Sequence, residues 1–267
     1  MKYFMDTEFL EGSQKLRLFG WNTGLDDVNT IDLISIGIVS EDGKEFYEVS
    51  KDFNLKEAWN RFQWKTTSNS VRSSANVKSF KMREVKEYWI RENVLLPIFK
   101  EFLKLETEYL IKQRRIIGYA PPLDTQFTYR NFKRLLKRFG KSNKEIAELI
   151  PDFCRVPTEH NFPEFYAYYG SYDWVVFCWL FGKMIDLPKG FPMFFKDLKI
   201  MLDSAAVDYY NERFHYLKEP EKLDVSDYDK ITFVENLNDY PTQDNCHNAL
   251  DDAKWDLKLY KFIEELL

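Results

Sequence analysis

The chain has 267 residues and lacks the features that mark several protein classes. Its three cysteines, Cys154, Cys178 and Cys246, are odd in number and widely spaced, which excludes a disulfide framework or a paired-cysteine metal site. No apolar run is long enough to cross a bilayer, and Asp6 comes too early for a signal peptide. We therefore expect a cytoplasmic protein with no membrane partner.

An excess of positive charge is also missing, since the formal net charge is -5. The chain as a whole is therefore not a basic nucleic-acid binder. A nuclease is still compatible with this charge, because a cluster of metal-binding carboxylates adds negative charge. Hydrophobic residues make up 45% of the chain and aromatic residues 17%, which is enough for a packed core and excludes global disorder.

The order of expected elements predicts an α/β fold with a mixed sheet flanked by helices. Residues 2–7, 31–40 and 45–50 are expected to be strands, and Asp42-Gly43 predicts a tight turn that pairs the last two. Further along the chain we expect a strand at 164–169 and helices over 84–105, 142–154, 172–182 and the last 21 residues. Residues 205–243 look irregular and acidic.

Two stretches look like insertions in a single domain that covers residues 1–267. Residues 60–84 contain a polar run rich in Ser and Asn, which predicts a surface loop. Residues 107–141 are strongly basic with interleaved aromatic residues. This second stretch could follow RNA phosphates with base stacking, or it could be a solvated helical face with its aromatic residues packed inward.

Two carboxylates stand at the end of the first expected strand. Asp6 and Glu8 are two apart, so their side chains point to the same face. Taken alone, such a pair is usually a solvated strand end. Asp173 follows the strand at 164–169 and a Gly-Ser turn, and taken alone it would be a helix cap.

A last acidic signal lies at the start of the final helix, where His247 and Asp252 are five apart. Capping by Asn248 would explain this segment too. Together, however, the four acids and one histidine form a chemical set. Two divalent cations need several bridging carboxylate oxygens, and carboxylates are the ligands that Mg²⁺ and Mn²⁺ prefer. A neutral His247 near them could take a proton from an attacking water.

At these positions the sequence resembles the DEDDh branch of the RNase H-like 3′–5′ exonucleases. The matching segments are "DTE" at 6–8, the isolated Asp173, and a histidine five residues before the last aspartate. Longer blocks resemble the mycobacterial-type AS exoribonuclease family, among them "IDLISIGIVSEDGKEFYEVS", "YYGSYDWVVFCWLFG" and "HNALDDA".

The resemblance implies an RNase H-like fold and a role for each matching residue. Asp6, Glu8, Asp173 and Asp252 would hold two Mg²⁺ or Mn²⁺ ions, and His247, with Glu8, would be catalytic, His247 as general base. Thr7, Phe9 and Leu10 would contact the terminal nucleotide, partly through their backbone. Glu11 has no motif position and is expected to be dispensable.

The predicted function is therefore a metal-dependent 3′–5′ exoribonuclease that releases nucleoside 5′-monophosphates from a single-stranded or overhanging RNA 3′ end by two-metal hydrolysis. A 3′–5′ DNA exonuclease of the proofreading kind is the main alternative, because sugar discrimination depends on 2′-OH contacts that motifs do not reveal. A non-catalytic nucleic-acid-binding module is a further alternative. RNA is the expected partner, with DNA and a homodimer left open.

Overall fold

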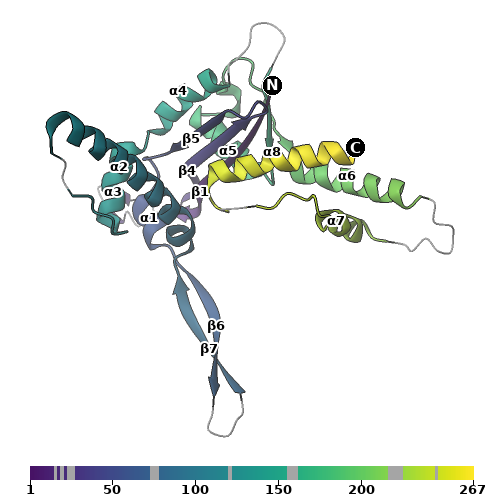
Figure 1. Ribbon diagram of the computed structural model, residues 1–267, viewed down its shortest axis with the longest axis horizontal. Helices are drawn as coiled ribbons and strands as arrows, with labels where there is room; N and C mark the ends of the chain where they lie inside the picture. Colours follow the sequence, from purple (N-terminus) through teal and green to yellow (C-terminus); the bar gives the residue numbers. More distant parts are fainter. Residues whose placement is uncertain are drawn as a thin grey trace. The chain divides into compact units, whose positions relative to one another are not determined.

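A computed structural model describes residues 1–14, 17–18, 21–22, 28–72, 78–119, 122–154, 162–215, 225–243 and 246–267. The chain forms two compact units (Figure 1). The first unit combines Met1–Phe53 with Gly140–Leu267, and the second is Asn54–Phe139. Each unit has its own helices and strands.

The first unit is built on a five-stranded mixed sheet with strand order β5-β4-β1-β8-β9. Its long central pair is antiparallel and joins β1 (Lys2–Gln14) to β4 (Val28–Ser40). The remaining strands are β5 (Glu45–Val49), β8 (Glu164–Ala167) and β9 (Lys196–Asp197), and a separate two-stranded sheet pairs β2 (Arg17–Leu18) with β3 (Trp21–Asn22). The sequence predicted the β4–β5 hairpin and the α/β class, and both predictions are confirmed.

Alternation along β1 divides the core between the two faces of the sheet. Tyr3 and Met5 pack on one face with side chains of α4 (Asn143–Phe153) and α5 (Ser171–Leu180). Phe4 packs on the other face with α6 (Leu198–Arg213), α7 (Asp227–Glu235) and α8 (Ala249–Leu266). Helices therefore cover both faces (Figure 1), as an RNase H-like sheet requires.

Two helix starts agree with the capping signals in the sequence. Ser142 caps α4, and its hydroxyl and the Glu145 side chain form a reciprocal capping box. Asn248 caps α8 by accepting the N–H groups of Leu250 and Asp251. Residues 205–243, expected to be irregular, in fact contain the end of α6 and all of α7 among their described residues. The sequence pattern did not indicate α7, because this helix is almost without amphipathic character and Val234 is its only buried side chain.

The second unit contains a helical core and a hairpin. Its helices are α1 (Leu55–Asn60), α2 (Leu96–Ile117) and α3 (Tyr129–Phe139), and a π-helical turn, η1 (Arg91–Leu95), precedes α2. Phe102 of α2 packs near both Phe132 and Phe139 of α3, with ring centroids 6.3 and 5.8 Å away. Aromatic side chains of the basic stretch therefore do pack inward.

Two predictions for the second unit were wrong. The described residues of the polar run in 60–84 lie in an antiparallel hairpin of two ten-residue strands, β6 (Gln63–Arg72) and β7 (Lys78–Glu87), and not in a loop. Backbone pairing and polar cross-strand contacts such as the Lys65–Glu87 ion pair form this ladder, which therefore lacks a clear apolar alternation in the sequence. The helix expected from 84 begins later, because β7 continues to Glu87, and Pro97 lies just after the π-helical turn η1, which runs directly into α2.

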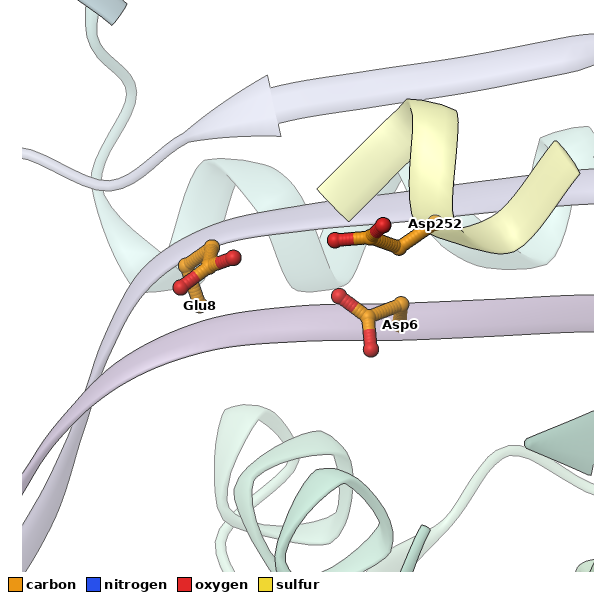
Figure 2. Close-up of side chains that lie close together, drawn as sticks. All are labelled: Asp6, Glu8 and Asp252. Atoms are coloured by element: carbon orange, nitrogen blue, oxygen red, sulfur yellow. The ribbon is translucent and has the colours of Figure 1, made fainter. Parts of the chain in front are cut away.

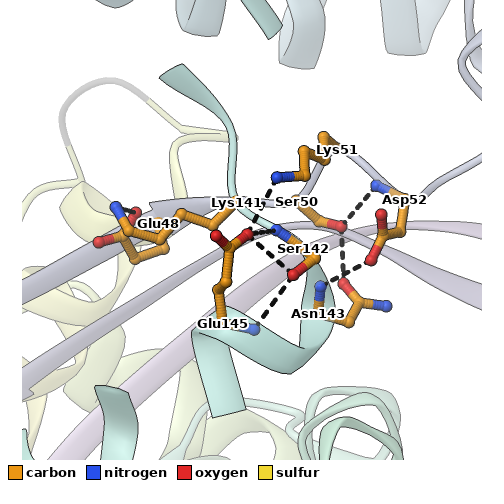
Figure 3. A network of polar contacts seen from close by, with 8 residues as sticks. All are labelled: Glu48, Ser50, Lys51, Asp52, Lys141, Ser142, Asn143 and Glu145. Carbon is orange, nitrogen blue, oxygen red and sulfur yellow. Dashed lines mark hydrogen bonds and ion pairs between the residues drawn. The ribbon is translucent and has the colours of Figure 1, made fainter. Parts of the chain in front are cut away.

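A network of polar contacts joins residues 48–52 to residues 141–145, where the chain leaves and re-enters the first unit (Figure 3). Ser50 and Lys141 form a parallel bridge, and the Ser50 hydroxyl donates to the Asn143 side chain at 2.6 Å. Lys51 pairs with Glu145 at 2.9 Å, and Lys141 pairs with Glu48 at 2.8 Å. These contacts connect the two chain segments of the first unit directly, without residues of Asn54–Phe139.

The predicted insertions, 60–84 and 107–141, lie in the second unit apart from Gly140 and Lys141. That the whole chain acts as one domain stays a prediction. Among the described residues, no helix is both long enough and apolar enough to cross a membrane.

Candidate active site

Strand β1 presents two carboxylates to the face of the sheet that α8 covers. Asp6 and Glu8 alternate with Thr7, so they share the face of Phe4, whose side chain lies in the α8 core. The register with β4 shifts between Glu8 and Phe9, which marks a β-bulge. A bulge at this place bends the strand just after its second carboxylate.

Gly37 allows helix α8 to start directly above this strand. Gly37 is the partner of Asp6 in the β1–β4 ladder. A side-chain Cβ at Gly37 would lie 2.2 Å from the backbone oxygen of Ala249, the first residue of α8. Only glycine therefore lets the first turn of α8, which carries Asp252, come this close to the sheet.

Three of the four predicted ligands converge as a result. Asp6, Glu8 and Asp252 each offer a carboxylate oxygen, and these oxygens all lie within 4.8 Å of one another. Figure 2 shows the three groups gathered between β1 and the first turn of α8. Asp6 and Glu8 are partly exposed, and Asp252 is 9% exposed.

Asp173 approaches from α5 and is tied to the same strand. It lies in the first turn of α5, where a negative charge suits the helix dipole, and it is 7% exposed. Its Oδ1 accepts the backbone N–H of Thr7 at 2.9 Å and the Thr7 hydroxyl at 2.6 Å. Strand β8 pairs with β1 only as far as Phe4, so Asp173 takes up a backbone N–H that no strand covers. Asp173 is therefore not an ordinary helix cap.

The carboxylates oppose one another's ionisation. Burial, together with the charges of Asp252 and Asp173, raises the pKa of Glu8 to about 8. Burial, followed by the charges of Asp173 and Glu8, also holds the pKa of Asp6 well above its usual range. Burial raises the pKa of Asp173, although its hydrogen bonds from Thr7 act in the opposite direction. The site thus favours a positive charge that would offset these anions.

His247 stands at the entrance to α8 with a left-handed backbone, at φ 72°. Its backbone N–H donates to Oδ2 of Asp252 at 2.9 Å. Burial raises the pKa of Asp252, although the hydrogen bonds from Gln243 and from the His247 backbone, and the nearby imidazole, act in the opposite direction. The capping interpretation and the site interpretation of this segment are therefore compatible, since Asn248 caps the helix while His247 and Asp252 stay in contact.

The predicted substrate contacts occupy different environments. Thr7 is buried and bonded to Asp173, and Leu10 is fully buried, so any contact that Leu10 makes with a nucleotide would come from its backbone. Phe9 is partly exposed, and its ring lies 5.7 Å from that of Tyr172, which is 52% exposed. The roles of these three residues in substrate binding stay predictions.

Two further polar residues belong to this neighbourhood. Asp256, four residues after Asp252, is 3% exposed and accepts the backbone N–H of Tyr168 at 3.3 Å. Burial and the charge of Asp173 raise its pKa. Its i+4 spacing from Asp252 places it on the same side of α8, but this spacing alone does not distinguish it from a surface acid. Gln243 donates to Oδ1 of Asp252 at 2.6 Å, and nothing in the sequence pattern indicated that contact.

The donor set fits a hard divalent cation. Three carboxylate oxygens within 4.8 Å of one another supply the oxygen ligands that Mg²⁺ and Mn²⁺ prefer. A cation there would also remove the electrostatic cost of burying several carboxylates together. Asp173 lies outside this tight group but raises the pKa of both Asp6 and Glu8, so it is close enough to act on the same charge.

Comparison with known proteins agrees with this geometry. A family model described as "3'-5' exoribonuclease Rv2179c-like domain" matches residues 24–264, which include Asp173, His247 and Asp252 but begin after Asp6 and Glu8. Two relatives from Mycobacterium tuberculosis are each 26% identical over 199 residues, or 74% of this chain and 72% of the relative. They are the 3'-5' exoribonuclease MT2234.1 of strain CDC 1551 / Oshkosh and the 3'-5' exoribonuclease Rv2179c of strain ATCC 25618 / H37Rv. The family expected from the sequence is thus confirmed, and the chain belongs to the 3′-5′ exoribonuclease Rv2179c-like domain family.

Proposed function

We propose that this protein is a 3′–5′ exoribonuclease that removes nucleoside 5′-monophosphates from RNA 3′ ends and depends on two Mg²⁺ or Mn²⁺ ions. The observation that carries the proposal is the convergence of Asp6, Glu8 and Asp252 within 4.8 Å, in a chain that belongs to an exoribonuclease family. Metal dependence and the individual residue roles are part of the proposal.

Asp6, Glu8, Asp252 and Asp173 would hold the cations. When bound, two such ions would stabilise the negative charge that develops on the attacking and leaving oxygens. Thr7 fixes the Asp173 carboxylate through two hydrogen bonds, and Gln243 fixes that of Asp252. These contacts limit the rotation of both carboxylates, as the partners of metal-ligating side chains usually do.

His247 would be the general base. An imidazole nitrogen would take a proton from the attacking water, whose oxygen forms a bond to the terminal phosphorus. The bond between that phosphorus and the 3′-oxygen of the preceding nucleotide breaks, and the 3′-oxygen takes up a proton. The products are one nucleoside 5′-monophosphate and an RNA that is one nucleotide shorter.

Matched site variants test the proposal. His247→Ala should lower the cleavage rate of single-stranded RNA by at least about 100-fold, the lower end of what a general base usually contributes, and Asp6→Asn, which removes a proposed metal ligand, should lower it at least as much. Glu11→Gln is the control, because Glu11 is an exposed acid on the same strand with no proposed role. All three should fold like the wild type by circular dichroism. An Asp6→Asn variant as active as the control would contradict the proposal.

A further inference from the structure

Charge is divided very unevenly between the two units. The second unit, Asn54–Phe139, contains 19 Lys and Arg against 8 Asp and Glu, a formal charge of +11. The whole chain carries -5, so the first unit carries -16. A strongly acidic unit repels a polyanion such as RNA, whereas a strongly basic one attracts it.

Helix α3 gathers this positive charge on one exposed face. Its eleven residues contain five basic and no acidic residues. Phe132, Leu135 and Leu136 are buried on the inner side of the helix. The five basic side chains are all exposed: Arg130, Lys133, Arg134, Lys137 and Arg138. Because they recur every three or four residues, they form a continuous row that we call the α3 basic face.

Two of the five basic side chains pair with a buried acid, and the other three do not. Glu106 of α2 is 4% exposed and pairs with Arg134 at 2.9 Å and with Arg138 at 3.0 Å. The Arg138 guanidinium also lies 3.7 Å from the ring centre of Tyr109. These contacts attach α3 to α2. The described residues give no ion pair to Arg130, Lys133 or Lys137, so these three can neutralise the charge of an incoming anion.

We propose that the α3 basic face binds the phosphates of single-stranded RNA. This inference rests on the proposed function, because it assumes that the substrate is RNA. The charge complementarity is direct: three basic groups face solvent along one helix, and a polyanion is the partner that such a row attracts over its full length. The solvated-face interpretation explains the exposure of these side chains but not the +11 charge of the whole unit.

The test measures RNA binding in EDTA, where the proposed metal-dependent cleavage cannot act. The triple variant Arg130→Gln, Lys133→Gln, Lys137→Gln leaves Arg134 and Arg138 in place, so Glu106 keeps its partners. Affinity for a long single-stranded RNA would be measured between about 50 and 200 mM salt. The plot of log affinity against log salt should become shallower by about 0.7 for each lost phosphate contact, or about 2 in total.

A matched control removes the same charge from the first unit. Lys189, Lys258 and Lys261 are exposed, and the triple variant Lys189→Gln, Lys258→Gln, Lys261→Gln should keep the wild-type slope. An α3 variant with the wild-type slope, or a control whose slope falls as much, would overturn the inference. Cleavage in Mg²⁺ would be measured separately: a wild type that binds RNA with the expected slope but does not cleave it would contradict only the proposed function.

Discussion

At the scale of single residues, the candidate site includes side chains that orient a proposed metal ligand without binding a metal themselves. Thr7 donates twice to Asp173, at 2.9 and 2.6 Å, and so sets the direction of a carboxylate that comes from a different element. A buried acceptor that loses one donor pays part of its desolvation cost, about 1–3 kcal/mol. We infer that Thr7 is a positioning residue as well as a predicted substrate contact.

Replacing Thr7 with Val removes the hydroxyl and keeps the shape of the side chain. We expect kcat to fall about tenfold, since 1.4 kcal/mol corresponds to a factor of ten, while KM for RNA changes little. Thr7→Ser restores the hydroxyl and should restore most of the rate. A raised KM with an unchanged kcat would instead mean that the Thr7 hydroxyl binds substrate and does not position Asp173.

At the scale of elements, one strand and the first turns of two helices supply the residues of the candidate site. Strand β1 supplies Asp6 and Glu8, the first turn of α5 supplies Asp173, and the first turn of α8 supplies Asp252. Helix α8 comes close to β4 at Gly37. The position of the α8 start therefore decides whether Asp252 reaches the other carboxylates.

Gly37→Ala tests this arrangement. The added Cβ would lie 2.2 Å from a backbone oxygen of α8, so the helix start must shift, and a displacement of about 1 Å can cost up to 100-fold in rate. We expect cleavage to fall at least tenfold, measured below the melting temperature. The control is Gly43→Ala, which strains a turn with φ +82° but meets nothing within 4 Å. The control should lower the melting temperature and keep the rate, and equal rates for the two variants would contradict the account.

The elements also show which features of the fold and the site could be predicted from the sequence. Period-two alternation was enough to place Asp6 and Glu8 on one face, and capping signals located the starts of α4 and α8. Asp256 was missed because a buried acid inside a helix looks like any surface acid until the packing is known. The β6–β7 hairpin was missed because its strands are polar, and only backbone pairing identifies them. The close approach of α8 to Gly37 depends on tertiary packing, and no local sequence pattern indicates it.

At the scale of the whole molecule, opposite charges are assigned to different units. The first unit carries the carboxylate cluster and -16, and the second carries +11. The net charge of -5 conceals this division, so composition alone could not reveal it. An enzyme that gathers carboxylates for metal ions gains from a separate basic surface, because its acidic unit would otherwise repel its polyanionic substrate. The proposed α3 basic face would supply that surface.

The central claim is that metal ions at the carboxylate cluster drive hydrolysis from the RNA 3′ end. Its most direct test is one gel of matched 5′-labelled RNA and DNA oligomers, each incubated with Mg²⁺, Mn²⁺ or EDTA. We predict a ladder that shortens one nucleotide at a time on RNA with either metal ion, a much weaker ladder on DNA, and no cleavage in EDTA. Undiminished cleavage of RNA in EDTA, or release of the 5′ label as a mononucleotide at the earliest times, would contradict the account.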